Sequence, residues 1–141
     1  MKYYRLQTKS YKLEDPVDLQ SGIVVASPHS GRNYRSSVAE QSILDPIILR
    51  SSEDAFVDEL MDFVPTLGIP LICSEIPRAF VDLNRARNEL DPAIIEGIKP
   101  IGQNPRVMSG LGVIPRVVAN GKEIYSGKLS KAVSYTHLRA H

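Results

Sequence analysis

The sequence of 141 residues contains one cysteine, no tryptophan, no excess of either charge and no long hydrophobic run. With Cys73 alone, no disulfide can form within the chain, which favours a reducing cytoplasm. Seventeen Lys and Arg against sixteen Asp and Glu, without a basic run, argue against a nucleic-acid partner. No apolar stretch approaches the roughly 20 residues of a membrane span, and the charged N-terminus has no apolar core behind it. We therefore expect a cytoplasmic protein with neither a membrane nor a nucleic acid as partner.

The composition indicates one globular domain. Hydrophobic residues make up 43% of the chain and charged residues 23%, a balance typical of folded domains. The length gives room for a single domain with a real core. The oligomeric state is left open by the sequence.

Two short apolar runs with a helical pattern between them predict an α/β fold. The run 23–26, Ile-Val-Val-Ala, is typical of an interior strand buried on both faces, and 69–73 is a second strand candidate. Between them, Ser51 and Asp54 have the spacing of an N-terminal helix cap. The apolar residues that recur at helical spacing after this cap are Phe56, Val57, Leu60, Met61 and Val64. A strand, a helix and a strand in this order predict a mixed, mostly parallel sheet flanked by helices.

The remaining segments carry weaker patterns. Residues 3–13 are expected to form an edge strand or an irregular lead-in, and residues 99–110, rich in Gly, Pro and Asn, a loop. The pair Asn120-Gly121 is a strong signal for a hairpin turn. A helix is expected to begin near Leu129.

His29 follows directly after the first apolar run, within Ser-Pro-His-Ser-Gly at 27–31. Open α/β sheets place their ligand sites where central strands end, so His29 can be a metal ligand or a general base. It can equally be a capping or surface residue. Glu53 and Asp54 offer a similar choice, between a favourable contact with a helix dipole and a carboxylate ligand directed back towards His29.

The stretch 77–85, Pro-Arg-Ala-Phe-Val-Asp-Leu-Asn-Arg, sets charged groups inside an apolar run. In a strand, Arg78, Asp82 and Asn84 would share one face, with Arg85 on the other. Unpaired charges are costly to bury, so we expect these groups to enter a cleft at the end of a strand. There Arg78 and Arg85 could bind a carboxylate through bidentate forks. The alternative is a structural ion-pair network around Asp82.

Four motifs stand in one order along the chain: Ser-Pro-His-Ser-Gly at 27–31, Glu-Asp-Ala-Phe-Val-Asp-Glu-Leu at 53–60, the stretch 77–85 with Asn-Glu-Leu-Asp-Pro at 88–92, and Gly-Leu-Gly-Val-Ile-Pro-Arg at 110–116. Together they resemble the N-formylglutamate amidohydrolase family, whose fold is similar to that of the zinc carboxypeptidases. The resemblance runs from about Ile23 to about Leu129. It implies metal-dependent hydrolysis of N-formyl-L-glutamate to formate and L-glutamate, as in histidine degradation, with a small N-acyl amino acid as the substrate.

The same resemblance implies a zinc ion, or another divalent metal, and a set of site residues. His29 matches the family's metal-binding histidine, and Asp54 is expected to be the carboxylate ligand, with Glu53 as the alternative. Arg78 would be catalytic, polarising the scissile carbonyl and stabilising the oxyanion. The residues implied for the α-carboxylate of the substrate are Asn84 and Arg85.

A catalytic zinc site usually has three protein ligands, and this chain supplies two. The family's third ligand, a histidine, and its catalytic glutamate have no match beyond residue 130. We therefore expect residues 1–133 to be the N-terminal part of a single amidohydrolase domain with an incomplete sheet, and residues 134–141 to be a non-family tail from read-through. Two other interpretations remain open: a truncated fragment without catalysis, and a hydrolase of a related N-acyl amino acid.

Overall fold

Three short strands form one sheet in the computed structural model, which describes residues 10–34, 40–99, 102 and 104–139. The strands are β1 (Tyr11–Glu14), β2 (Val25–Ser27) and β3 (Leu71–Ser74), in the order β1-β3-β2. β1 pairs with β3 antiparallel, and β2 pairs with β3 parallel. The expected mixed α/β fold is confirmed, whereas the expected excess of parallel strands is not, because one pair of each kind is present.

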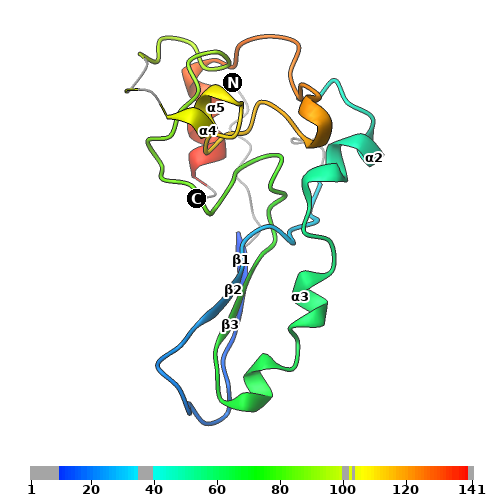
Figure 1. Cartoon of the computed structure of the whole chain (residues 1–141), viewed down its shortest axis with the longest axis vertical. Coiled ribbons are helices and arrows are strands. Elements are labelled where there is room, and N and C mark those ends of the chain that lie inside the picture. The colour runs from blue at the N-terminus through cyan, green and yellow to red at the C-terminus, as the bar shows by residue number, and fades with distance from the viewer. Residues whose placement is uncertain (1–9, 35–39, 100–101, 103, 140–141) are drawn as a thin grey trace.

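Short helices surround the sheet. The α-helices are α2 (Pro46–Leu49), α3 (Val57–Leu60), α4 (Pro105–Met108) and α5 (Lys131–Leu138), and the 3₁₀ turns are η1 (Arg50–Ser52), η2 (Val64–Leu67) and η3 (Ala119–Gly121). The sheet and α3 occupy the lower part of the molecule in Figure 1, and α4 and α5 the upper part. In the described part of the chain, no helix has both the length and the apolar composition needed to cross a bilayer.

The two elements on which the fold class was predicted are present, but each differs in detail. The apolar run 23–26 is only partly strand, because Ile23 and Val24 precede β2 and are 62% and 60% exposed. β2 lies at an edge of the sheet, so burial on both faces was a wrong expectation. The long helix predicted from Phe56 splits into α3 and η2, and no side chain caps the start of α3. Phe56 directly precedes α3 and has a φ of 64°, a left-handed conformation that a right-handed helix cannot continue through.

The other predicted strands, turns and loops are present wholly or in part. The candidate strand at 69–73 is confirmed as β3, and part of 3–13 forms the edge strand β1, while residues 1–9 lie outside the described chain. The chain reverses at Asn120-Gly121, with one antiparallel bridge between Val117 and Glu123. The loop expected at 99–110 was wrong in part, because α4 lies there, with the side chain of Asn104 accepting from the backbone of Arg106.

Most of the apolar core lies away from the sheet. One large cluster is built mainly by residues 76–125 and closed by Leu138 of α5, and a small one lies under the sheet. The buried members of the large cluster are Leu49, Ile76, Ala79, Phe80, Val81, Ile94, Ile95, Val113, Ile114, Val118, Ile124, Tyr125 and Leu138, and those of the small cluster Val64, Leu71 and Cys73. The chain that carries the polar stretch 77–85 is therefore anchored on both sides by buried side chains.

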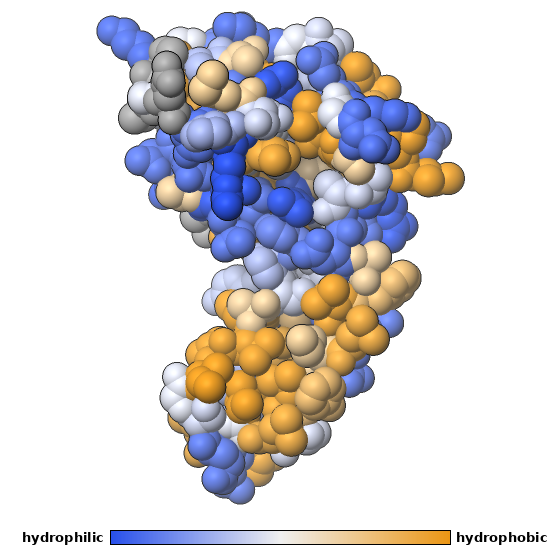
Figure 2. Space-filling model, in the orientation of Figure 1, coloured by the Kyte–Doolittle hydropathy of each residue, from blue (hydrophilic) through white to orange (hydrophobic). Residues whose placement is uncertain are grey.

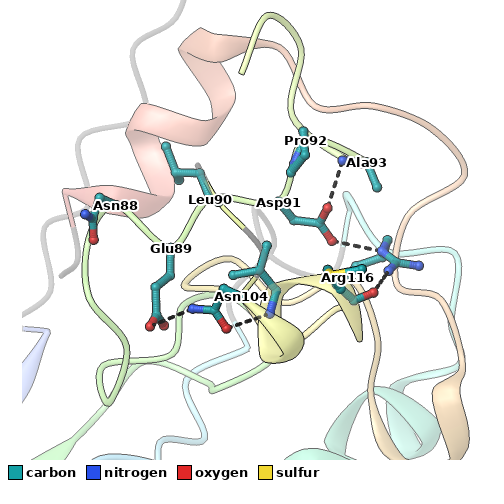
Figure 3. A pocket seen from close by; sticks show the side chains of 11 residues that line it. Asn88, Glu89, Leu90, Asp91, Pro92, Ala93, Asn104 and Arg116 are labelled. Carbon is teal, nitrogen blue, oxygen red and sulfur yellow. Dashed lines mark hydrogen bonds and ion pairs between the residues drawn. The ribbon is translucent and has the colours of Figure 1, made fainter. Parts of the chain in front are cut away.

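A buried ion pair fixes residues 88–93 against residues 104–116, around a cavity of about 510 Å³ (Figure 3). Asp91 is 3% exposed, and its carboxylate accepts from Arg116 Nε at 3.0 Å and from the backbone N–H of Ala93 at 2.8 Å. A second tie joins Glu89 to the side-chain amide of Asn104 at 3.2 Å. Because these polar groups bond one another, we interpret the cavity as the junction between residues 88–93 and residues 104–116.

The junction predicts a specific stability effect. Arg116→Met keeps the length of the side chain but leaves the carboxylate of Asp91 buried without its cation, and it should lower the free energy of unfolding by about 3 kcal/mol. Chemical denaturation measures the change. Arg106→Met is the matched control, because Arg106 is exposed on α4 and makes no side-chain contact of this kind. Equal effects of the two substitutions would contradict the proposed role of the ion pair.

α5 buries a histidine. His137 has no exposed surface, stacks on Phe80 with 3.8 Å between ring centroids, and hydrogen-bonds Val133 through Nδ1 at 3.0 Å. The hydroxyl of Tyr125 donates to its Nε2 at 3.4 Å. Burial lowers the pKa of His137 to about 4, from the ordinary 6.5, which means that the fold holds this ring neutral.

Stability should therefore fall in acid. A folded-state pKa below the unfolded value means that protonation favours unfolding, so stability is full above pH 6.5 and is lost as the pH falls towards about 4. The loss should reach about 3 kcal/mol, at 1.36 kcal/mol per pKa unit. His137→Phe should flatten the profile between these two values. An unchanged slope would mean that α5 does not pack as described, and it would support the prediction that residues 134–141 are foreign.

Candidate active site

His29 is held in a tight turn two residues beyond the end of β2. Gly31 makes the turn possible, because a Cβ at that position would lie 2.1 Å from the carbonyl oxygen of Ile76. The hydroxyls of Ser27 and Ser30 bond each other at 2.7 Å across the turn. The imidazole is consequently buried, at 8% exposure, against the chain that follows β3.

Asp82 is the polar centre of the site. It is 2% exposed, and its Oδ1 lies 2.8 Å from Nε2 of His29 and 2.9 Å from the backbone nitrogen of Asn84. Its Oδ2 accepts from Nε of Arg78 at 3.2 Å and lies 3.8 Å from Nε of Arg85. Four partners thus surround one buried carboxylate, and the ion-pair network considered for this stretch is present.

The stretch 77–85 is not a strand. Its backbone folds as turns, with the N–H groups of Phe80 and Val81 donating to Pro77, so the predicted alternation of faces was wrong. The N–H of Asp82 donates to Val113 at 2.8 Å. Turns let neighbouring polar groups point to one centre, which a strand with side chains on alternate faces cannot do.

The charge of Asp82 is stabilised against its burial. Burial by itself would raise the pKa of this carboxyl. The hydrogen bond and charge of His29, the N–H of Asn84 and the guanidinium of Arg78 outweigh burial and hold the pKa below its ordinary value. Asp82 is therefore an acceptor and Nε2 of His29 the donor, an arrangement that in the neutral imidazole puts the lone pair on Nδ1.

Asp54 lies on that second side of the imidazole. Its Oδ2 is 3.4 Å from Nδ1 of His29, and its side chain is 51% exposed. A backbone hydrogen bond of 3.0 Å from the N–H of Asp54 to the carbonyl of His29 ties the two loops together. The neighbouring Glu53 is bound instead by Arg50 at 3.0 Å. Of the two carboxylates singled out by the sequence, the structure brings Asp54 to His29.

A cleft of about 490 Å³ opens beside these groups. Its charged lining residues are Glu53, Asp54, Arg78 and Asp82. The other lining residues are Ser51, Ser52, Ser109, Leu111, Pro115, Val117, Val118, Ala119 and Gly121. The lining is thus charged at these four residues and largely apolar at those from 109 to 121.

Asn84 and Arg85 are placed differently from Arg78. Neither lines the cleft, and the side chain of Arg85, 10% exposed, lies between Asp82 and Glu89, 4.0 Å from the latter. The roles expected for these two residues stay predictions. The sequence pointed to His29, Asp54 and Arg78, and named Asp82 only as the centre of a structural ion-pair network. No local spacing could have indicated the contact between His29 and Asp82, because the two are 53 residues apart.

The donors left for a metal ion are Nδ1 of His29 and the carboxylate of Asp54. Within the described residues, no group of three or more His, Cys, Asp or Glu side chains could hold a metal ion. The structure thus brings together two donors and one partner that orients the histidine. Such a pair can bind a divalent cation, or accept a proton from a polar group in the cleft.

Comparison with known proteins gives two matches relevant to this site. The model of the N-formylglutamate amidohydrolase family matches residues 21–140. A crystal structure of N-formylglutamate amidohydrolase from Ralstonia eutropha JMP134 is similar with a TM-score of 0.84 and 30% identity, over 95% of this chain and 48% of that one. None of the curated proteins compared matches the chain. The chain spans about half the length of the structural neighbour, and it belongs to the N-formylglutamate amidohydrolase family.

Proposed function

We propose that this chain carries the N-terminal part of the active site of an enzyme that hydrolyses N-formyl-L-glutamate to formate and L-glutamate. The observation that carries the proposal is the position of His29, between the buried Asp82 and the exposed Asp54, at the edge of a cleft. The family to which the chain belongs, and the name of the structural neighbour, supply the substrate. Degradation of histidine in the cytoplasm is the context we propose for this reaction.

We further propose that the site holds zinc. Imidazole nitrogen and carboxylate oxygen are ligands that zinc accepts, and a ligating histidine usually donates its other N–H to a carboxylate, as His29 does to Asp82. Bound zinc lowers the pKa of its water to about 7 and so supplies a hydroxide at neutral pH. His29 and Asp54 are two ligands, and a third would come from polypeptide outside this chain.

The other residues bind and orient the substrate. Asp82 accepts from Nε2 of His29, and this selects the tautomer of the neutral imidazole in which the lone pair is on Nδ1, the nitrogen that lies 3.4 Å from Oδ2 of Asp54. Arg78 reaches Asp82 through Nε only, and no described residue bonds its two Nη groups. Those groups can donate to the carbonyl oxygen of the formyl group, where negative charge develops during hydrolysis.

We assign Asn84 and Arg85 to the α-carboxylate of the substrate. Arg85 has a buried stem and a guanidinium within 4.0 Å of two carboxylates, Asp82 and Glu89. Since neither residue lines the cleft, this role rests on the family to which the chain belongs.

A related N-acyl amino acid is the second candidate substrate. The apolar lining residues of the cleft are Leu111, Pro115, Val117, Val118 and Ala119, and they offer surface that a formyl group, with one carbon, would not use. Hydrolysis of a longer acyl group in preference to formyl would support this candidate.

The metal site is tested by metal titration of this chain and of a version extended by its native downstream sequence. His29→Ala and Asp54→Asn should each weaken zinc binding more than tenfold, because each removes a donor. Asp82→Asn should weaken it about 10- to 100-fold through the orientation of His29. Glu53→Gln is the matched control and should bind zinc normally, since Glu53 faces Arg50. Full zinc content in the His29→Ala variant would refute the assignment.

The substrate residues are tested by the kinetics of formate release in the extended version. Arg78→Ala should lower kcat about 10²- to 10³-fold, because it removes a donor to the developing oxyanion. Arg85→Ala should raise KM about 10- to 100-fold, the value of a hydrogen bond to a charged group. The exposed Arg87→Ala should change neither. An unchanged KM in the Arg85→Ala variant would refute the carboxylate role, and activity of the 141-residue chain alone would refute the interpretation as an inactive fragment.

A further inference from the structure

The segment 53–59, which carries Asp54, owes little of its position to the core. No residue of α3 is buried, and no side chain caps the start of this helix. Leu60 at its end is 70% exposed, and contact with the small cluster under the sheet begins later, at Met61 and Val64. Figure 2 shows hydrophobic residues gathered on the surface of the part of the molecule that holds the sheet and α3. Contacts other than core packing must therefore hold Asp54 in place.

The backbone is strained two residues after Asp54. Phe56 has φ 64° and ψ 10°, in the left-handed region that bulky side chains seldom adopt. Strain of this kind persists only where surrounding contacts hold it, and it gathers at functional sites. The carbonyl of Asp54 accepts from the N–H of Val57 at 3.4 Å across this turn. The direction of the Asp54 side chain consequently depends on what holds Phe56.

Arg32 makes contacts that hold this turn. Its Nη2 donates to Oδ2 of Asp58 at 2.9 Å and to Oε1 of Glu59 at 3.0 Å. Its Cζ lies 5.1 Å from the centre of the Phe56 ring, within the range of a cation–π contact. A single ion pair at a surface contributes little, but this half-buried guanidinium binds two carboxylates and a ring at once. Arg32 therefore fixes Phe56 itself and the turn of α3 that follows it.

Arg32 is in turn fixed to the loop that carries His29. The N–H of its neighbour Asn33 donates to the carbonyl of Glu75, just beyond β3, at 3.1 Å. The two loops are thus joined at two points, by the backbone bond from Asp54 to His29 and, three residues after His29, by the side chain of Arg32. Two ties fix a relative orientation that one tie would leave free to rotate.

We propose that Arg32 is a positioning residue, which holds Asp54 beside Nδ1 of His29 by fixing the left-handed turn at Phe56. Arg32 is not among the residues that line the cleft, so it acts through Asp54 rather than on the substrate. Loss of a residue that orients a metal ligand lowers metal affinity about 10- to 100-fold. The zinc readout of this inference rests on the proposed function, whereas the position of Asp54 is measured without a metal.

The test measures zinc affinity and amide exchange in the 141-residue chain. Arg32→Met keeps an apolar stem near Phe56 and removes both ion pairs. Zinc should bind about tenfold more weakly, and in the metal-free chain the amide of Asp54, which donates to His29, should exchange about tenfold faster. Arg106→Met removes an exposed arginine of α4 and should change neither quantity. Equal results for the two variants overturn the proposal.

A second substitution separates positioning from a general contribution to stability. Asparagine adopts the left-handed conformation more readily than phenylalanine, so Phe56→Asn should remove the strain that Arg32 offsets. Added to Arg32→Met, it should restore most of the lost zinc affinity and slow the exchange of the Asp54 amide. A double variant that binds zinc as weakly as Arg32→Met overturns the proposal, because Arg32 then contributes only stability.

Asp58→Asn decides the question if circular dichroism shows that Arg32→Met does not fold. It removes one of the two ion pairs and should shift both readouts in the same direction by about threefold, the effect of one exposed pair. No shift overturns the proposal.

Failure of the proposed metal site gives a different result. If the wild-type chain binds no zinc, that site is refuted, and exchange of the Asp54 amide alone decides the role of Arg32. Faster exchange in Arg32→Met that Phe56→Asn reverses then supports the role, and unchanged exchange overturns it.

Discussion

The carboxylate of Asp82 is the constraint on which the site depends. A charge at 2% exposure is tolerated only with partners, and here they come from two separate parts of the chain, the turn after β2 and the stretch 77–85. Any displacement of the turn relative to the stretch would leave the charge uncompensated. The position of His29 is therefore fixed by the energetic cost of leaving the carboxylate of Asp82 buried without a partner. In this way a fold built of short elements can hold a side chain in one place.

The apolar residues of the same stretch supply the anchoring. Phe80 and Val81, at 2% and 0% exposure, belong to the large core cluster, and the N–H of Asp82 is bonded to Val113. The ion pair of Asp91 with Arg116 holds residues 110–116 in turn, and residues 109–121 form the apolar wall of the cleft. The packed core, the buried ion pair and the apolar wall of the cleft are thus connected by direct contacts.

Local signals in the sequence predicted the parts of the fold that depend on local physics. A β-branched run such as 69–73 favours a strand anywhere, and Asn120-Gly121 favours a reversal because both residues tolerate positive φ, as they adopt here. The pattern could not show that the helix after Phe56 would break, or that 77–85 would fold as turns, because burial of specific partners decides both. The contact of His29 with Asp82 depends on chain closure over 53 residues. By contrast, the position of Asp54 close to His29 could be predicted, because the end of a strand and the start of the next helical segment meet at the same edge of a sheet.

The uncharged edge of the described sheet and the candidate site meet at β2. This strand presents the uncharged edge, and its carboxyl end leads into the turn that carries His29. In a parallel sheet, neighbouring strands end at the same edge, and their terminal side chains meet in one crevice. β2 and β3 are parallel, so the turn after β2 that carries His29 and the stretch 77–85 that follows β3 leave the sheet at the same edge, which is why His29 and Asp82 meet although 53 residues separate them.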